Sequence, residues 1–105
     1  MEPRLRPLDY ISHRHLYAYE LKRLRTEQGF SKSRFAIMVG VSRRYLIKLE
    51  AAEASPTLEM MERLAAGLDV SVLNMVDFEA IERRMNADDG TDPNDAPGIT
   101  VEYGG

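Results

Sequence analysis

The sequence contains no cysteine among its 105 residues. This absence excludes disulfide bonds, Cys-ligated zinc or iron–sulfur sites and thiol nucleophiles. Long apolar runs are absent as well, because none approaches the roughly 18 residues of a membrane span. Residues 1–7 also lack the apolar core of a signal peptide. We therefore expect a cytoplasmic protein.

Patterns that mark an enzyme are also missing. The sequence shows no Ser/His/Asp set, no glycine-rich phosphate loop and no cluster of metal-ligating residues. The two histidines, His13 and His15, would point about 200° apart on a helix and so do not share a metal ion. We expect no catalytic residue, no metal site and no cofactor.

The charge of the chain is unevenly distributed. The net charge of −3 argues weakly against a nucleic-acid partner, since nucleic-acid binders are more often basic. Residues 1–50, however, contain 11 Lys and Arg against 5 Asp and Glu, a net charge of +6. Residues 51–105 contain 3 against 12, a net charge of −9. Such asymmetry indicates a basic binding surface joined to an acidic segment.

Composition divides the chain into three regions. Two prolines and the basic residues Arg4, Arg6 and Arg14 indicate a flexible basic N-terminal arm over residues 1–15. Residues 16–85 carry nearly all of the periodic apolar pattern and are expected to form the folded domain. Residues 86–105 are rich in Asp, Pro and Gly, a composition that predicts an acidic flexible tail.

The middle region contains residues that are typical of helix starts and helix ends. Glycines suited to end a helix stand at Gly29 and Gly40, and the last helix is expected at about residues 72–85. No strand pattern competes, so the predicted fold is all-α, a compact domain of five helices. The candidate N-caps of these helices are Asp9 or Ser12, then Ser31, Ser42, Thr57 and Ser71.

Residues 32–50 have the pattern of two short helices joined by a glycine turn. Helices that cross steeply need a small residue at the crossing and a turn residue that tolerates positive φ. Ala36 and Gly40 occupy these positions. The segment therefore predicts a helix-turn-helix, and the apolar residues expected to pin it to a core are Phe35, Val39, Val41, Leu46 and Leu49.

The second helix of this pair, residues 42–51, is expected to expose a basic face. With Leu46 and Leu49 inward, a turn of about 100° per residue places the other side chains outward. Arg and Lys in the major groove can donate to guanine O6 and N7, and an aliphatic group can meet a thymine methyl. The expected base contacts are Arg43, Arg44, Ile47 and Lys48. The expected phosphate contacts are Lys32 and the helix N-termini at Ser31 and Ser42.

Four stretches of the chain have a combined spacing that is specific. They are Leu21-Lys-Arg-Leu-Arg-Thr-Glu-Gln-Gly29-Phe-Ser31, Val41-Ser-Arg-Arg-Tyr45-Leu-Ile-Lys-Leu49-Glu50, Pro56-Thr-Leu-Glu59, and Leu64-Ala65 with Leu68-Asp-Val70-Ser71. Together they resemble the Xre/Cro/cI-type helix-turn-helix family of phage and bacterial regulators. The resemblance covers about residues 16–76.

The resemblance implies a five-helix lambda-repressor-like domain that binds operator DNA as a dimer. It implies base contacts from Arg43, Arg44 and Lys48, with Ser42 and Tyr45 near the DNA backbone. It also implies a structural ion pair between the first helix and the end of the recognition helix, matched here by Arg25 and Glu50.

The chain departs from the family pattern at two places. Lys32 stands where the family usually has a glutamine that fixes a phosphate and orients the recognition side chains. The loop at residues 51–55 has one acid and no base, where the family often has glycine and basic residues. Weak anchoring to the DNA backbone is expected there, and an arm carrying Arg4, Arg6 and Arg14 would compensate by wrapping the duplex.

The expected function is that of a sequence-specific double-stranded DNA-binding regulator, a repressor in a bacterium, phage or mobile element, associated with the nucleoid. A homodimer would bind a palindromic operator, and its interface is expected at Phe78, Ile81 and Met85. One alternative is an antitoxin-type regulator that also neutralises a protein partner through the acidic tail. Another is a protein-interaction adaptor whose helix-turn-helix does not bind DNA.

Overall fold

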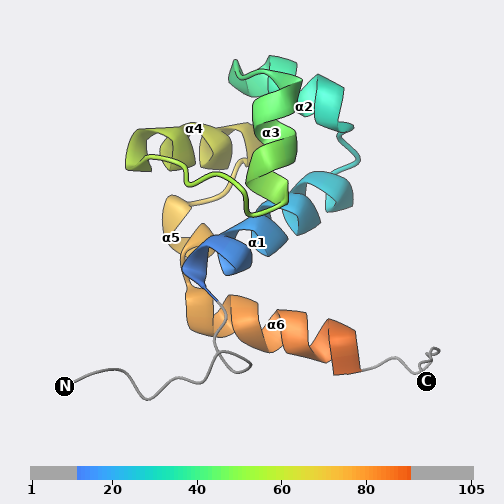
Figure 1. Ribbon diagram of the computed structural model, residues 1–105, viewed down its shortest axis with the longest axis vertical. Coiled ribbons are helices and arrows are strands. Elements are labelled where there is room, and N and C mark those ends of the chain that lie inside the picture. The colour runs from blue at the N-terminus through green and yellow to red at the C-terminus, as the bar shows by residue number, and fades with distance from the viewer. Residues whose placement is uncertain (1–11, 91–105) are drawn as a thin grey trace.

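The computed structural model describes residues 12–90, and the regular elements in that range are all α-helices (Figure 1). They are α1 (His13–Glu27), α2 (Lys32–Val39), α3 (Arg43–Glu50), α4 (Leu58–Leu68), α5 (Val72–Met75) and α6 (Phe78–Gly90). α1 crosses the middle of the molecule, with α6 along one side and α2, α3 and α4 on the other (Figure 1). The predicted all-α class is confirmed. Within residues 12–90, no helix has the length and apolar character to span a membrane.

Each of the first five helices begins at a hydroxyl side chain that accepts a hydrogen bond from its own first turn. The bond satisfies one of the backbone N–H groups that a helix start leaves unpaired. The predicted caps are confirmed, and at the first helix the cap is Ser12. The five pairs are Ser12 with the His15 N–H (3.2 Å), Ser31 with Arg34 (3.1 Å), Ser42 with Tyr45 (3.0 Å), Thr57 with Met60 (3.1 Å) and Ser71 with Leu73 (3.1 Å).

The core draws side chains from every helix. Its largest fully buried members are Leu21, Phe35, Leu46, Leu49, Leu64, Leu68, Met75 and Ile81. α2 and α4 lie in close contact at Gly67, where an added Cβ would lie 2.5 Å from Val39 Cγ1 and 3.3 Å from Phe35 Cε1. Glycine at this position therefore lets α2 pack directly on the backbone of α4, and this contact holds the first helix of the helix-turn-helix in place.

The prediction of a single last helix at about residues 72–85 is wrong, because two helices, α5 and α6, occupy this region. Val76 ends α5 with a non-helical backbone (φ −118°, ψ 13°). The Asp77 carboxylate then accepts a hydrogen bond from the Ala80 N–H at 3.3 Å and so starts α6. A short acidic side chain that bonds the following backbone competes with helix continuation, which explains the break.

The predicted boundaries of the arm and the tail also change. α1 begins at His13, so residues 13–15 belong to the domain and not to the arm predicted over residues 1–15. α6 continues to Gly90, so residues 86–90 are helical and not part of the tail predicted to begin at residue 86. Residues 1–11 and 91–105 lie outside the described residues.

The dimer interface predicted at Phe78, Ile81 and Met85 is corrected by the packing of α6 on α1. Ile81 is fully buried in the core of the same chain and cannot meet a second copy. Phe78 is half-buried and stacks on His13, with ring centroids 4.4 Å apart. Met85 is also half-buried. The break before α6 turns this stripe toward α1, which the periodicity of one continuous helix did not reveal.

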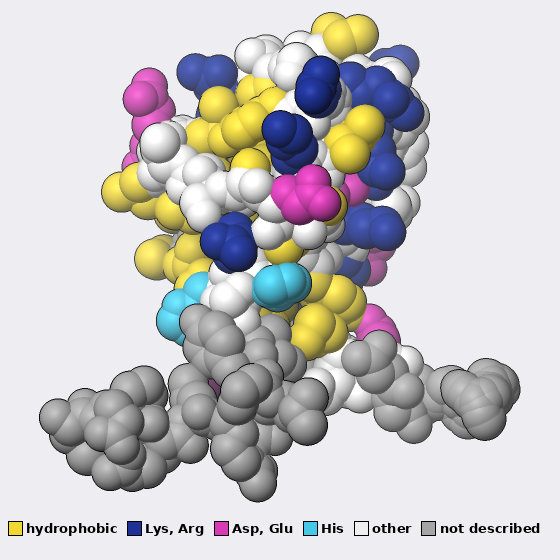
Figure 2. All heavy atoms as spheres, viewed as in Figure 1, with side chains coloured by type: hydrophobic (Ala, Val, Ile, Leu, Met, Phe, Trp, Pro, Cys, Tyr) yellow, Lys and Arg dark blue, Asp and Glu magenta, His cyan; other side chains and the backbone are white. Residues whose placement is uncertain are grey.

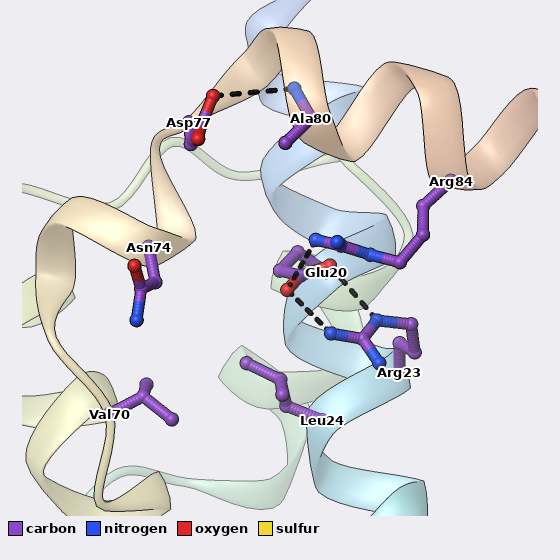
Figure 3. A pocket seen from close by; sticks show the side chains of 8 residues that line it. All are labelled: Glu20, Arg23, Leu24, Val70, Asn74, Asp77, Ala80 and Arg84. Carbon is purple, nitrogen blue, oxygen red and sulfur yellow. Dashed lines mark hydrogen bonds and ion pairs between the residues drawn. The ribbon is translucent and has the colours of Figure 1, made fainter.

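A buried carboxylate joins α1 to α6. Glu20 accepts hydrogen bonds from Arg23 (Nε–Oε1 3.1 Å, Nη2–Oε2 2.8 Å) and from Arg84 of α6 (Nη2–Oε2 3.0 Å). The three side chains line an open pocket of about 240 Å³ between α1, α5 and α6 (Figure 3). Burial acts to raise the pKa of Glu20, but the hydrogen bonds and charges of Arg23 and Arg84 outweigh it and hold that pKa below its usual value.

This lowered pKa predicts a specific loss of stability in acid. A group whose pKa is lower in the folded than in the unfolded state stabilises the fold fully at pH values above its unfolded-state pKa. This stabilisation is lost as the pH falls through the folded-state pKa. We therefore expect the free energy of unfolding, measured by urea titration, to fall below about pH 4.5 in the native protein. Glu20→Gln should unfold more easily at pH 7, by about 1–3 kcal/mol, and show a flatter acid limb.

Glu27→Gln is the matched control for this experiment. Glu27 also pairs with Arg23, at 3.3 Å, but its side chain is 65% exposed. In the control, the free energy of unfolding should fall with decreasing pH as it does in the native protein, since an exposed ion pair contributes little to stability. An acid limb that Glu20→Gln leaves unchanged would show that Glu20 does not couple folding to pH.

Candidate nucleic-acid interface

α2 and α3 are joined by a three-residue turn, as the sequence predicts. Gly40 takes the left-handed conformation (φ 77°, ψ 35°) and ends α2. The Gly40 and Val41 N–H groups both donate to the Ala36 carbonyl, at 2.9 and 3.0 Å. Ser42 then caps α3 at once. Because only a residue tolerant of positive φ allows so short a reversal, Gly40 sets the angle between the two helices.

The inner face of this helix pair is fully buried. Leu46 and Leu49 of α3 are 0% and 1% exposed, and Phe35, Ala36 and Val39 of α2 are buried with them. Val41 of the turn is half-buried against the same cluster. Burial of one side leaves the other side of α3 at the surface, and its exposed residues are Arg43, Arg44, Ile47 and Lys48. These are the four residues predicted to lie on that face.

The end of α3 is fastened to α1 by the buried ion pair that the family resemblance implied. Arg25 donates from Nε to Glu50 Oε2 at 2.6 Å and from Nη2 to Oε1 at 2.9 Å. Its third nitrogen, Nη1, donates to the Phe30 carbonyl at 2.6 Å. The two side chains are 7% and 3% exposed. One guanidinium therefore fixes α1, the segment leading into α2, and the C-terminal turn of α3 relative to one another.

Positive charge gathers over α2 and α3 (Figure 2). Arg34, Arg43, Arg44 and Lys48 are exposed, and Lys32 is half-buried at the start of α2. Among residues 12–90, the ion pairs involve other cations, namely Arg23, Arg25 and Arg84. The five cations of α2 and α3 are therefore available to an anionic partner.

The remaining residues predicted to contact DNA fall into two groups. Ser31 and Ser42 lie at the N-termini of α2 and α3, where their hydroxyls accept bonds from their own helices, and Tyr45 is a half-buried residue of α3. Arg4 and Arg6 lie outside the described residues.

One basic residue of this surface, Arg34, was not among the predicted contacts. Arg34 lies in the first turn of α2 and is exposed. Its place two positions after Lys32, at a predicted helix start, was a signal that could have identified it. Arg14, predicted to belong to the arm that wraps the duplex, lies instead in α1 and reaches the loop after α3, where its Nε donates to the Ala52 carbonyl at 2.8 Å. No pattern in the sequence indicates that contact, because the two residues are 38 positions apart.

Residues 21–73 match the model of the helix-turn-helix family HTH_3. The HTH-type transcriptional regulator SutR of Escherichia coli is 44% identical over 50 residues, which make up 48% of this chain and 28% of SutR. The HTH-type transcriptional regulator SinR of Bacillus subtilis is 36% identical over 58 residues, which make up 54% of this chain and 52% of SinR. The match thus spans about half of SinR and less than a third of SutR.

A solved structure has the same arrangement of helices. The crystal structure of SinR, the master regulator for biofilm formation, in complex with DNA aligns with a TM-score of 0.55 at 34% identity. The alignment covers 58% of this chain and 98% of that chain. The likeness confirms the predicted lambda-repressor-like helix-turn-helix fold.

The buried pair predicts a large and asymmetric effect of mutation. Glu50→Ala leaves the Arg25 guanidinium buried without its counter-charge, so we expect a loss of about 3–5 kcal/mol in the free energy of unfolding. The double variant Arg25→Met with Glu50→Leu should lose less than Glu50→Ala alone, because no uncompensated charge remains. Urea denaturation measures both, and the exposed Glu27→Ala serves as a control that costs under about 1 kcal/mol. A Glu50→Ala loss no larger than that of the control would contradict a structural role for the pair.

Proposed function

Because the chain belongs to the helix-turn-helix family HTH_3, of the Xre and lambda-repressor-like type, we propose that it represses transcription by binding a specific double-stranded DNA sequence. The observation that carries the proposal is the outer face of α3. Its four exposed residues are three cations without an ion pair among residues 12–90 and one aliphatic residue, while its inner face is buried. The similar SinR structure is a complex with DNA, which supports the same function.

α3 is proposed to enter the major groove and read base edges. Arg43 and Arg44 lie in its first turn, the part of a recognition helix that reaches the bases, and each can donate two hydrogen bonds to guanine O6 and N7. Lys48 follows one turn later with one more donor group. Ile47, 37% exposed between them, offers an aliphatic surface to a thymine methyl.

The DNA backbone is proposed to be held at the starts of α2 and α3. Phosphates carry negative charge and bind at helix N-termini, where backbone N–H groups point outward. The proposed contacts there are Ser31, Lys32, Ser42 and Tyr45, to which the exposed Arg34 is now added. Arg4 and Arg6 of the N-terminal arm are proposed to contact phosphates further along the duplex.

The protein is proposed to bind a palindromic operator as a homodimer. A two-fold contact needs an exposed apolar patch that meets its own copy, and Ile81 is not available for it. Leu58 of α4 and Leu73 of α5 are 62% and 72% exposed, and the two helices pack against each other on the same side of the molecule (Figure 1). We therefore place the interface at this patch, which we name the Leu58/Leu73 patch.

Selection of bound sequences from a random DNA pool tests the proposed function. The native protein should recover a palindrome and bind it with an affinity that falls steeply with salt. Arg44→Ala should weaken that binding by about 1–3 kcal/mol, or roughly 5- to 150-fold, while binding to unrelated DNA changes far less. Arg83→Ala, which removes an exposed charge from the remote α6, is the control and should keep the specificity.

Two outcomes would contradict this proposal. An equal loss on all sequences in Arg44→Ala would refute direct reading of bases. A folded native protein that enriches no sequence would refute operator binding and favour the protein-interaction adaptor.

The Leu58/Leu73 patch makes a separate prediction about assembly. Leu73→Glu places a charge in the proposed apolar contact, so it should shift sedimentation equilibrium from dimer toward monomer by at least tenfold in dissociation constant. Ile37→Glu on α2 is the matched control, because Ile37 is 80% exposed but lies outside the patch. If both variants dissociate to the same extent as the native protein, the interface lies elsewhere.

A further inference from the structure

Arg14 joins the first turn of α1 to the loop that follows α3. Its Nε donates to the Ala52 carbonyl at 2.8 Å. The start of α1 thereby lies beside the chain that leaves the recognition helix (Figure 1). A cation of α1 is thus brought close to the proposed DNA-binding surface.

The loop itself is fastened to the last turn of α3. The Ala52 N–H donates to the Leu49 carbonyl at 3.1 Å, and the Glu53 N–H donates to the Lys48 carbonyl at 2.8 Å. Ala52 is 7% exposed and has a positive φ of 61°. The Ala52 carbonyl, which accepts the hydrogen bond from Arg14, is therefore fixed relative to α3. It lies one helical turn beyond the exposed Lys48 of the recognition face.

Residues 51–55 supply no positive charge of their own, and Glu53 adds an exposed negative one. Arg14 is exposed and, among residues 12–90, its side chain donates through Nε alone. Within this described range, its two terminal nitrogens have no hydrogen-bond partner and can donate to an incoming group. A guanidinium can present a pair of N–H groups to two oxygens of one phosphate, so the unused edge of Arg14 fits that anion.

We infer, on the basis of the DNA-binding function proposed above, that Arg14 docked on the Ala52 carbonyl forms a binding site for a phosphate of the DNA backbone. The site lies beside the C-terminal end of the recognition helix. The docking bond restricts a long side chain before DNA arrives, which lowers the entropy cost of ordering it in the complex. Arg14 of α1 thus provides the contact to the DNA backbone that the sequence of the loop at residues 51–55 does not provide.

A purely structural role makes a different prediction. A cation near the C-terminal end of α3 stabilises the helix dipole, and the bond to Ala52 secures a residue of unfavourable backbone conformation. Both effects alter folding stability and leave the number of phosphates bound to DNA unchanged. The salt dependence of DNA binding therefore separates the two roles.

Arg14→Gln tests the phosphate site, because glutamine keeps an N–H donor for the Ala52 carbonyl but carries no charge. With the operator recovered by selection, the slope of log K against log salt concentration should become shallower by about 0.9, equivalent to one phosphate. Binding at about 0.1 M salt should weaken by roughly tenfold, to a similar degree on operator and unrelated DNA. Arg14→Lys should keep the native slope, and Arg83→Gln on α6 is the charge-matched control that should also keep it.

A second measurement does not depend on how stable the variant is. Duplexes with one neutral methylphosphonate linkage at successive positions should include one that weakens binding of the native protein and causes no further loss in Arg14→Gln. A native slope in Arg14→Gln, or no linkage whose effect depends on Arg14, would overturn the phosphate site while leaving operator binding intact. Failure of the native protein to bind any selected operator would overturn both proposals.

Discussion

The recognition helix depends on one buried ion pair for its position. α3 has eight residues, too few to be stable as an isolated helix, so its place is set by what holds it. Leu46 and Leu49 anchor its inner face, and the Arg25–Glu50 pair fixes its last turn to α1. The same guanidinium binds the Phe30 carbonyl just before α2 begins. Because two charges removed from water stabilise a fold only when their geometry is good, the bidentate pair permits one arrangement of α1, α2 and α3 and disfavours others.

Two sets of cations in this small domain have different partners. Arg25 and Arg84 bind carboxylates of another helix, at Glu50 and Glu20, and hold helices together, whereas Arg23 pairs with Glu20 and Glu27 within α1. The cations on the outer sides of α2 and α3 have no such carboxylate among residues 12–90. The net charge of −3 therefore says little about the binding surface, because many of the acids lie on other elements and some neutralise internal arginines. What favours DNA as a partner is the local surplus of cations on one helix pair, together with the family to which the chain belongs.

α6 changes the interpretation of the second half of the chain. It lies along α1, buries Ile81 and brings Arg84 to Glu20, so it completes the core and is not a free dimer seam. Tyr19 of α1 also bonds the Asp88 carboxylate near the end of α6, which extends the contact along much of both helices. Exposed leucines on α4 and α5, Leu58 and Leu73, take the place of α6 as the proposed dimer contact. The start of α1, which the sequence predicted to be part of an arm, is helical and contacts the loop after α3 through Arg14.

Features that depend on neighbours along the chain could be predicted from the residues alone. The caps at Ser31, Ser42, Thr57 and Ser71, the left-handed Gly40 and the outward residues of α3 all follow from local hydrogen bonding, sterics and helical periodicity. The resemblance to a known family added the distant pair Arg25 and Glu50, which no local rule identifies. The break at Asp77 was missed because the apolar pattern of α5 and α6 also fits one continuous helix.

Other features became visible only in the folded chain. Ile81 faces the core, Glu20 lies between two arginines and Arg14 meets Ala52. Each of these contacts depends on how helices far apart in the chain pack together. That packing is fixed by shape and burial in three dimensions, which one-dimensional periodicity does not contain.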